Sequence, residues 1–433
     1  MRQCQKKQFG SVRSCLARFV CCAALALTCA QCYVSADCHD ADLSCSGLPV
    51  LLYLYNQPVI YTGGTITVPG NFTQWQVRRF DPDGALVWQL LLFESASATG
   101  TLERIKAAPD GNLYVYGINS LTGGGDHYLV KVSSAGAILW TATWGQSFGE
   151  SANALTVDAN GNVYAVGTFN NGTNDDWWIK KFAPDGTEIT TGWNKIFNGA
   201  ANNSDTPKSV NVSVDGFVYV SGAIDDGLGV EGAIRKFQAD GTEITTGWNK
   251  RFGTTIDCSA CSLGSDAAGN LYLATNINTG NTAWYVRKFA PDGTEFGGGW
   301  PYRLDFNGGT DFLFSLAIGP QQEIVVSGWL DPTGTGTQTV GHFVRLDSDG
   351  RVSWTYEANG GTESDIYAGV DVDRFGRFYF AGLLSYLGAP AVYDQSLIRL
   401  DRNGRLDANS AWQGKGIDAG FGLSDYYIAL DIP

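Results

Sequence analysis

The sequence predicts an all-β fold, a seven-bladed β-propeller of four-stranded blades that is closed by the C-terminal strand completing the first blade. Three observations support this prediction. A unit of roughly 53 residues recurs along the chain, each unit reads as four short strands, and the last segment supplies the strand that the first unit lacks. Radial repetition of small sheets is the usual outcome of such a pattern.

The most regular element of the repeat is an apolar residue followed by a tight turn that ends in glycine. It recurs at Phe80–Gly84, Val132–Gly136, Phe182–Gly186, Phe237–Gly241, Phe289–Gly293, Leu346–Gly350 and Leu400–Gly404. In three copies the turn is Pro-Asp-Gly, where proline presets the first turn dihedral and glycine takes the left-handed one. Each copy therefore predicts a short hairpin between a third and a fourth strand.

Each unit also contains an inner strand of small apolar residues, such as Ala152–Val157, and a second strand that usually contains tyrosine. The third strand carries one basic residue in every copy, and the fourth carries one tryptophan. The basic residues are Arg79, Lys131, Lys181, Lys236, Lys288, Arg345 and Arg399, and the tryptophans are Trp88, Trp140, Trp193, Trp248, Trp300, Trp354 and Trp412. We interpret the basic residues as local ion pairs or a solvated edge rather than as an anion-binding ring. The tryptophans are interpreted as packing between blades.

Circular closure follows from the two ends of the repeat region. One strand around Val59–Thr67 precedes the first hairpin, and no inner strand comes before it. The C-terminal segment Ser424–Asp431 matches the inner strand Ser364–Asp371. We therefore expect the last strand to complete the first blade, which removes exposed sheet edges.

The strings Asp158–Gly167 and Leu397–Asp407 resemble bacterial β-propeller repeat proteins of the SBBP and NHL-like kind. The resemblance covers about residues 57–433. It implies the propeller fold and an extracytoplasmic setting, and it transfers no catalytic residue.

The N-terminal segment predicts export. Residues 1–36 read as a signal peptide, with a basic start, the short apolar core Phe19–Leu27 and a small-residue cleavage site at Val34-Ser35-Ala36. Residues 37–56 form a cysteine-containing leader, and residues 57–433 form the propeller. The alternative is that the signal peptide leads to lipidation of Cys29 or Cys32. We expect a secreted, periplasmic or cell-surface protein.

The four cysteines after the signal predict two disulfides, because an exported chain matures in an oxidising compartment. Proximity pairs Cys38 with Cys45 and Cys258 with Cys261. Half a zinc site or a redox pair is the alternative at Cys258–Cys261, but no second cysteine or histidine cluster follows it.

Charge restricts the partners. The chain has 43 acidic and 29 basic residues and a net charge of −14, and loss of the signal makes it more acidic. Such a surface repels nucleic acid and anionic membranes, so neither is expected as a partner. No segment is long and apolar enough to predict a membrane span, and we expect a monomer.

The two faces of the predicted ring differ. The short-turn face carries the tight turns within hairpins. The long-loop face carries the long connections Asn119–Asp126, Phe169–Asp176, Ile224–Gly232, Asn276–Thr282, Asp331–Gly341 and Ser385–Asp394. Long variable loops over a channel mouth usually carry the function of such a fold, so we place a ligand site there.

Five inner strands begin with a carboxylate near the long-loop face: Glu150, Asp205, Asp311, Asp365 and Asp425. If these side chains point into the channel, they form a negative collar for a cationic ligand or a divalent cation such as calcium. The alternative is that each carboxylate caps its own loop by accepting backbone N–H groups. No cofactor is otherwise indicated.

The sequence favours a non-catalytic binding or scaffolding propeller that uses its long-loop face for a protein, glycan or cationic ligand. A lyase with a histidine acid–base group at the channel mouth is the alternative, and it would need His127 or His342. Both histidines occupy repeat positions that hold aromatic residues in other copies, which favours a packing role for them.

Overall fold

The computed structural model describes residues 58–432 apart from 69–71, 94–99, 121–124, 147–148, 257, 259, 307–308, 334–338, 359–365, 386–392, 408–412 and 418–424. The predicted signal peptide, the leader, the Cys38–Cys45 disulfide, Asp365 and Trp412 lie outside the described residues. Within the described part, no helix has the length and apolar character needed to cross a bilayer.

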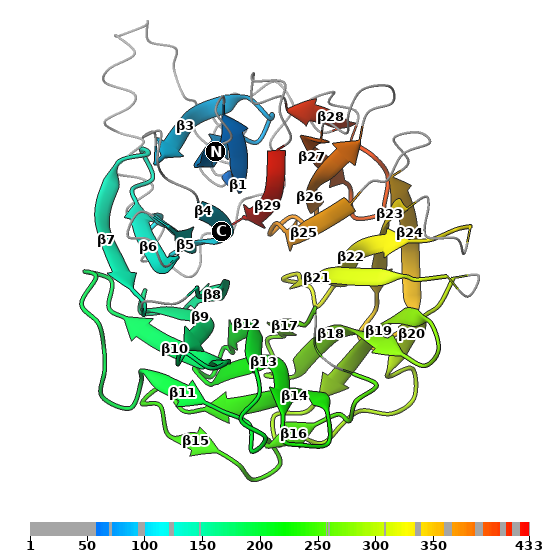
Figure 1. Cartoon of the computed structure of the whole chain (residues 1–433). Helices are drawn as coiled ribbons and strands as arrows, with labels where there is room; N and C mark the ends of the chain where they lie inside the picture. The colour runs from blue at the N-terminus through cyan, green and yellow to red at the C-terminus, as the bar shows by residue number, and fades with distance from the viewer. Residues whose placement is uncertain are drawn as a thin grey trace, which may run out of the picture. The chain divides into compact units, whose positions relative to one another are not determined.

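Twenty-nine strands form seven antiparallel sheets in the described part of the chain, and the sheets are the blades of a propeller (Figure 1). Blade 1 contains β29 (Asp425–Asp431), β1 (Ile60–Val68), β2 (Phe72–Phe80) and β3 (Leu86–Leu92). Blade 2 contains β4 (Gly100–Ala107), β5 (Leu113–Asn119), β6 (Asp126–Val132) and β7 (Ile138–Trp144). Blade 3 contains β8 (Ala152–Val157), β9 (Val163–Asn170), β10 (Asp175–Phe182) and β11 (Lys195–Phe197).

Blade 4 contains β12 (Thr206–Val212), β13 (Val218–Asp225), β14 (Val230–Phe237) and an outer strand in two pieces, β15 (Glu243–Ile244) and β16 (Lys250–Arg251). Blade 5 contains β17 (Ser262–Ser265), β18 (Leu271–Asn278), β19 (Thr282–Phe289) and β20 (Tyr302–Leu304). Blade 6 contains β21 (Phe312–Ile318), β22 (Ile324–Leu330), β23 (Val340–Leu346) and β24 (Val352–Ala358). Blade 7 contains β25 (Ile366–Val372), β26 (Phe378–Ser385), β27 (Tyr393–Leu400) and β28 (Gln413–Ile417).

The predicted circular closure is confirmed. Strand β29 pairs antiparallel with β1, with Tyr61 opposite Asp431 and Ile66 opposite Asp425. Figure 1 shows β29 beside β1, at the inner edge of the ring between β25 and β4. The C-terminal strand is thus the inner strand of the first blade.

A β-bulge interrupts the inner strand of most blades. The register of β4, β8, β12, β21 and β25 against the second strand skips one residue, which leaves Glu103, Asn153, Lys208, Phe314 and Ala368 as the extra residues. A bulge bends its strand and changes the direction of the extra side chain. Lys208, Phe314 and Ala368 line the central channel. The side chain at the bulge position therefore differs from blade to blade on the channel wall, although the strands pair in the same way in each of these blades.

The recurrent basic residue and tryptophan form one repeated structure, which we call the inter-blade clasp. In blade 4, Lys236 Nζ and Trp248 Nε1 both donate to the carbonyl oxygen of Pro291 in the next blade, each at 2.9 Å. Lys236 also lies 5.2 Å from the ring centroid of Tyr219. The acceptor residues around the ring are Ser134, Pro184, Ala239, Pro291, Ser348, Arg402 and, for Arg399, Pro82.

The clasp confirms the packing role predicted for the tryptophans and corrects the prediction for the basic residues. Lys131 pairs with Asp110 and Arg399 with Asp407, but the contact common to all seven basic residues is a hydrogen bond to a turn of the neighbouring blade. A hydrogen bond from a charged donor in a poorly solvated site is stronger than a solvated ion pair. The sequence analysis considered contacts within one blade only. In the folded ring the blades pack side by side, and the hairpin turn of the next blade lies within hydrogen-bonding distance of each basic side chain.

Candidate functional site

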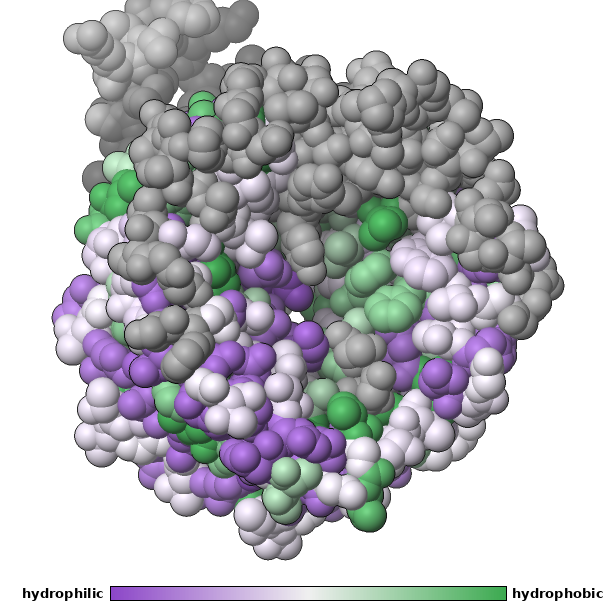
Figure 2. Space-filling model, viewed as in Figure 1, coloured by the Kyte–Doolittle hydropathy of each residue, from purple (hydrophilic) through white to green (hydrophobic). Residues whose placement is uncertain are grey.

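A cavity of about 200 Å³ occupies the central channel. Its wall includes residues from the inner strands of all seven blades, from Arg104 of β4 round to Leu430 of β29. Neutral polar groups are frequent in it: Thr156, Ser209, Asn211, Ser262 and Ser315. Figure 2 shows the hollow at the centre of the ring, with hydrophilic surface on its left side and hydrophobic surface on its right.

Aromatic side chains of blade 6 mark one side of the channel. Phe312 lies opposite Trp329 in the β21–β22 pair, and their rings stack with centroids 5.9 Å apart. Phe314, the bulge residue that lines the cavity, has its centroid 5.3 Å from that of Phe312. All three side chains are partly exposed. We call Phe312, Phe314 and Trp329 the aromatic stack; it runs from the channel wall toward the long-loop face.

The aromatic stack occurs in blade 6 and not at the matching positions of blades 2 and 4. The cross-strand pair that corresponds to Phe312 and Trp329 is Thr101 with Ile118 in blade 2 and Thr206 with Ala223 in blade 4. Sequence analysis missed these aromatics because it looked for residues that recur. They could have been found by looking for positions at which one unit departs from the repeat, here at the end of the unit near the channel.

The other side of the channel is cationic. The residues that line the cavity include three cations, Arg104, Lys106 and Lys208, and no carboxylate. Arg104 Nη1 donates to the carbonyl oxygen of Glu103 at 2.7 Å. Glu103 interacts electrostatically with both Arg104 and Lys208, although burial raises the pKa of its carboxyl. Lys106 in turn interacts with Asp431 and Asp371, so the cations of the wall have carboxylates directly behind them.

The described carboxylates of the predicted collar are buried and accept backbone hydrogen bonds. Asp205 accepts from Gly199 N and, at 2.7 Å, from Asp225 N. Asp311 accepts from Phe306 N at 2.6 Å and from Asp331 N at 3.1 Å. Each carboxylate therefore ties the loop before its strand to the start of the connection after the second strand.

Glu150 follows the same pattern with one difference. Its Oε1 accepts from Gln146 N at 2.9 Å, and the backbone of Asn170 is a further donor. Its Oε2 is buried with no hydrogen-bond partner among the described residues. Burial raises the pKa of Glu150 to about 7, and the nearby Asp126 and Asp175 add to this effect. A proton on this carboxyl removes the cost of a buried charge.

These contacts favour the loop-capping interpretation of the described carboxylates. Burial also raises the pKa of Asp205 and Asp311. In the described part of the chain, no group of three His, Cys, Asp or Glu side chains is arranged to hold a metal ion. Asp425 begins β29, and Asp365 lies outside the described residues. The cation-binding collar stays a prediction.

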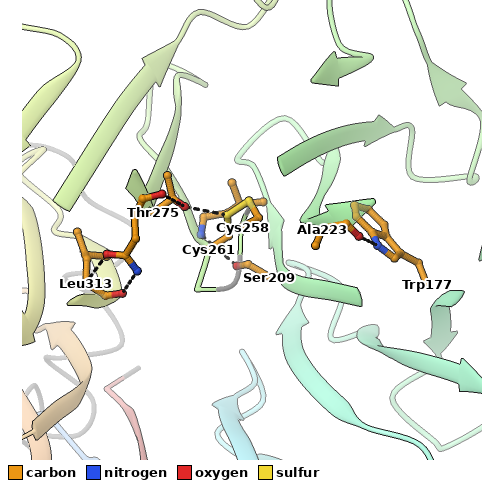
Figure 3. Close-up of a disulfide and its surroundings, with 9 residues drawn as sticks. Trp177, Ser209, Ala223, Cys258, Cys261, Thr275 and Leu313 are labelled. Carbon is orange, nitrogen blue, oxygen red and sulfur yellow. Dashed lines mark hydrogen bonds between the residues drawn. A yellow bond between two sulfur atoms is a disulfide. The ribbon is translucent and has the colours of Figure 1, made fainter. Parts of the chain in front are cut away.

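The Cys258–Cys261 disulfide is present in the structure, with Cα atoms 4.9 Å apart. Figure 3 shows it between Ser209 of blade 4 and Thr275 of blade 5. Thr275 Oγ1 lies 3.4 Å from Cys261 Sγ, and both cysteines are buried. Cys258 stands at the repeat position of Asp205 and Asp311, so blade 5 fastens its loop with a covalent bond in place of a carboxylate.

Both histidines of the blades are packing residues, as their repeat positions predict. His127 is fully buried, and its Nε2 donates to Thr168 O at 2.9 Å, just as Trp177 Nε1 donates to Ala223 O at 2.8 Å one blade later. Tyr116 Oη donates to His127 Nδ1 at 2.8 Å, which fixes the tautomer.

The electrostatics of the two histidines agree with this role. Burial lowers the pKa of both His127 and His342 to about 4. His342 is 5% exposed and lies edge-on to Trp284. Neither histidine lines the channel cavity. Two neutral, enclosed imidazoles cannot exchange protons with a ligand in the channel.

A carboxylate–ammonium cluster joins three blades near the short-turn face. Asp431 of β29 accepts from Ala107 N at 2.7 Å and pairs with Lys106 of β4. Asp371 of β25 accepts from Ile432 N at 2.8 Å. Burial raises the pKa of Asp371 to about 7, an effect that Lys106 opposes. The closing strand is thus bonded to the blades on both of its sides.

No family model matches the chain, and no curated protein matches it. Solved structures are similar to it in fold. A puromycin hydrolase mutant matches with a TM-score of 0.53 and 14% identity, over 84% of this chain and 55% of that chain. A polysaccharide lyase matches with a TM-score of 0.50 and 10% identity, over 78% and 87% of the two chains.

A protein of unknown function from Dyadobacter fermentans matches with a TM-score of 0.47 and 10% identity, over 70% of this chain and 96% of that chain. Identities this low show the fold alone. The resemblance to SBBP and NHL-like repeats therefore stays a prediction, while the structure itself establishes a seven-bladed β-propeller.

Proposed function

We propose that this chain is an exported, non-catalytic binding module that takes its ligand at the mouth of the central channel on the long-loop face. The observation that carries the proposal is the aromatic stack of Phe312, Phe314 and Trp329. All three rings are partly exposed, and Phe314 is the aromatic residue among those that line the channel cavity. Aromatic side chains in the wall of a cavity are typical of ligand contacts.

The chemistry of the channel supports binding rather than turnover. An acid–base mechanism needs a proton shuttle that reaches the ligand. The two histidines in the blades are enclosed and neutral. The carboxylates of Asp205 and Asp311 accept backbone N–H groups, and Glu150, which accepts from Gln146 N through Oε1, is buried and outside the cavity lining. A lyase would need another acid–base pair, and the cavity lining offers no carboxylate for it.

Binding of a panel of soluble oligosaccharides and peptides tests this proposal, with affinities measured by isothermal titration calorimetry. We expect at least one ligand whose affinity falls roughly tenfold or more in Trp329→Ala. Phe296→Ala is the matched control, since Phe296 is an exposed aromatic on the short-turn face, and it should bind normally. Equal loss in both variants, or product formation from a bound ligand, would overturn the proposal.

A further inference from the structure

The outer strand of each blade is the edge of its sheet, and these edges differ in length and charge. Strands β3 and β7 have seven residues each and contain no charged side chain. Strands β11, β15, β16 and β20 have three residues or fewer, and the outer strands of blades 3 to 7 carry Lys195, Lys250, Arg251, Arg303, Glu357 and Lys415. Short length and charge are the usual means by which proteins prevent an edge strand from pairing with another chain. The edges of blades 1 and 2 have neither protection.

The edge of blade 2 is open along the whole of β7. Among the described residues, β7 pairs with β6 alone, and Figure 1 shows it as a long strand at the outer rim of the ring. Its Trp140 face packs toward blade 3, where Trp140 Nε1 donates to Pro184 O at 3.0 Å. Ile138 and Leu139 are 48% and 51% exposed, and Thr141 and Thr143 are exposed as well. An extended segment of another chain can therefore reach both the backbone and the side chains of this edge.

Blade 1 extends this uncharged surface. Leu86 and Val87, at the start of β3, are about half exposed. Trp88 Nε1 beside them donates to Ser134 O, in the turn before β7, at 3.0 Å, so the starts of the two outer strands are neighbours. Exposed apolar side chains on two adjacent edges indicate an interaction surface, whereas a single exposed apolar residue would need no explanation.

The turn that leads into β7 has lost the charge that this turn carries elsewhere. In the other copies it contains an aspartate: Asp81, Asp185, Asp240, Asp292, Asp347 and Asp401. In blade 2, Ser133 Oγ accepts from Ala137 N at 3.0 Å, the contact that Asp347 Oδ1 makes with Arg351 N at 2.9 Å in blade 6. From Val132 to Gly149 the sequence contains no charged residue. Blade 2 thus keeps the geometry of the turn and departs from the repeat in its charge.

The charge of the chain indicates which partner a neutral edge suits. The net charge is −14, so two copies repel each other over most of their surfaces. A cationic partner would be attracted by the aspartate that the other turns keep, and it gains nothing from a neutral edge. An acidic partner needs such an edge, because like charges brought together at an interface oppose binding. A second copy of this chain is a partner of that kind.

We propose that two copies of this chain pair through blade 2, with β7 of one copy antiparallel to β7 of the other. A two-fold axis at Thr141 places Leu139 opposite Thr143 of the second copy, so uncharged side chains meet along the whole edge. The sequence analysis expected a monomer. Because one strand pair buries less than the roughly 1,600 Å² of a standard interface, we expect a weak dimer with a dissociation constant on the order of 10 μM.

Sedimentation velocity of the full chain between roughly 1 and 100 μM tests this inference. Thr141→Lys places two like charges opposite each other and should weaken the dimer roughly tenfold or more. Thr355→Lys is the matched control and should leave the dimer unchanged. Thr355 is exposed and holds the same position in β24, since it pairs with Val344 as Thr141 pairs with Val130. Added salt should strengthen the dimer, because it screens the repulsion between two acidic chains.

Hydrogen exchange locates the interface in the unaltered chain. Backbone amides of Ile138–Trp144 should exchange more slowly as the concentration rises, and those of Val352–Ala358 should not. A chain that sediments as a monomer throughout this range would overturn the inference, and so would a dimer that both lysine variants weaken equally or that leaves exchange in β7 unchanged. If circular dichroism shows that Thr141→Lys is misfolded, Leu139→Glu repeats the test at a second exposed position of the same edge.

Discussion

The two faces of this propeller differ in how regular their contacts are from blade to blade. On the short-turn face, one clasp of a cation and a tryptophan on a neighbouring carbonyl repeats around the ring. On the long-loop face, the blades differ more: blades 4 and 6 fasten their loops with Asp205 and Asp311, blade 5 has the Cys258–Cys261 disulfide instead, and blade 6 adds aromatic side chains. The regular face holds the ring together, and the irregular face carries the candidate site.

This difference shows where recurrence is informative in a repeat protein. A contact that every blade makes with the next contributes to stability many times over, so it is kept uniform. The channel has a single candidate ligand site, by contrast, and only a few blades need to supply residues that contact the ligand. Departures from the repeat, such as Phe314 and Lys208 at the bulge position, are therefore the better indicators of a site.

The largest expected effect comes from breaking a clasp. Trp248 is 1% exposed and packs between blades, so Trp248→Ala should lower the free energy of unfolding by about 3–5 kcal/mol. Trp329→Ala, on the partly exposed aromatic stack, should lower it by only about 1 kcal/mol. Urea unfolding followed by tryptophan fluorescence measures both. Similar losses in the two variants would remove the distinction between the faces.

The next largest loss of stability is expected from a substitution in the closing strand β29. Asp431→Ala removes the acceptor of Ala107 N and leaves Lys106 without this carboxylate. We expect a loss of about 3 kcal/mol, because the buried Ala107 N loses its acceptor and Lys106, whose side chain is 39% exposed, loses one of its two neighbouring carboxylates. Asp349→Ala is the control; Asp349 pairs with Arg351 on an exposed turn, and its loss should cost no more than about 1 kcal/mol. Equal unfolding midpoints for the two variants would contradict this prediction.

A smaller effect is expected at the disulfide. Replacement of both Cys258 and Cys261 by serine opens a closed loop of four residues, and chain entropy predicts a loss of about 2 kcal/mol for so short a loop. Differential scanning calorimetry of the double variant provides the measurement. An unchanged melting temperature would mean that the loop is fastened by its other contacts.

The effect that is smallest per step of the measurement is a pH dependence centred on Glu150. Burial raises its folded-state pKa to about 7, so between about pH 4.5 and 7 the folded state holds a proton that the unfolded state has lost. This group therefore stabilises the protein fully at the acid end of that window and by about 1 kcal/mol less for each unit of rising pH.

Glu150→Gln should remove this slope, which unfolding measured at a series of pH values will show. Asp371 has the same direction of shift and remains in the variant. His127 and His342, with pKa values lowered to about 4, give slopes of opposite sign between about pH 4 and 6.5, so the comparison is made between the variant and the parent chain at each pH. An identical pH profile for the variant and the parent chain would show that Glu150 is ionised in the folded state.

The candidate site could be predicted only in part. The inner-strand carboxylates were located from the repeat, but their partners, such as Asp225 N and Asp331 N, follow the second strand and become near neighbours only in the folded blade. His127 was correctly assigned to packing, because its repeat position holds tryptophan in other blades. The aromatic stack was missed, since the search was for residues that recur, whereas Phe312 and Trp329 depart from the repeat.

The sequence by itself was sufficient to predict the four-stranded blade, the number of blades and the closure of the ring. Turn chemistry at Pro-Asp-Gly, alternation within strands and the match of Asp425–Asp431 to an inner strand are local signals, and they were sufficient for the number of blades and the closure. Only the tertiary structure decided the composition of the channel. Arg104, Lys208 and Phe314 are about a hundred residues apart from one to the next, and ring closure brings them to one cavity. Local sequence patterns carry no information about which residues meet across a ring.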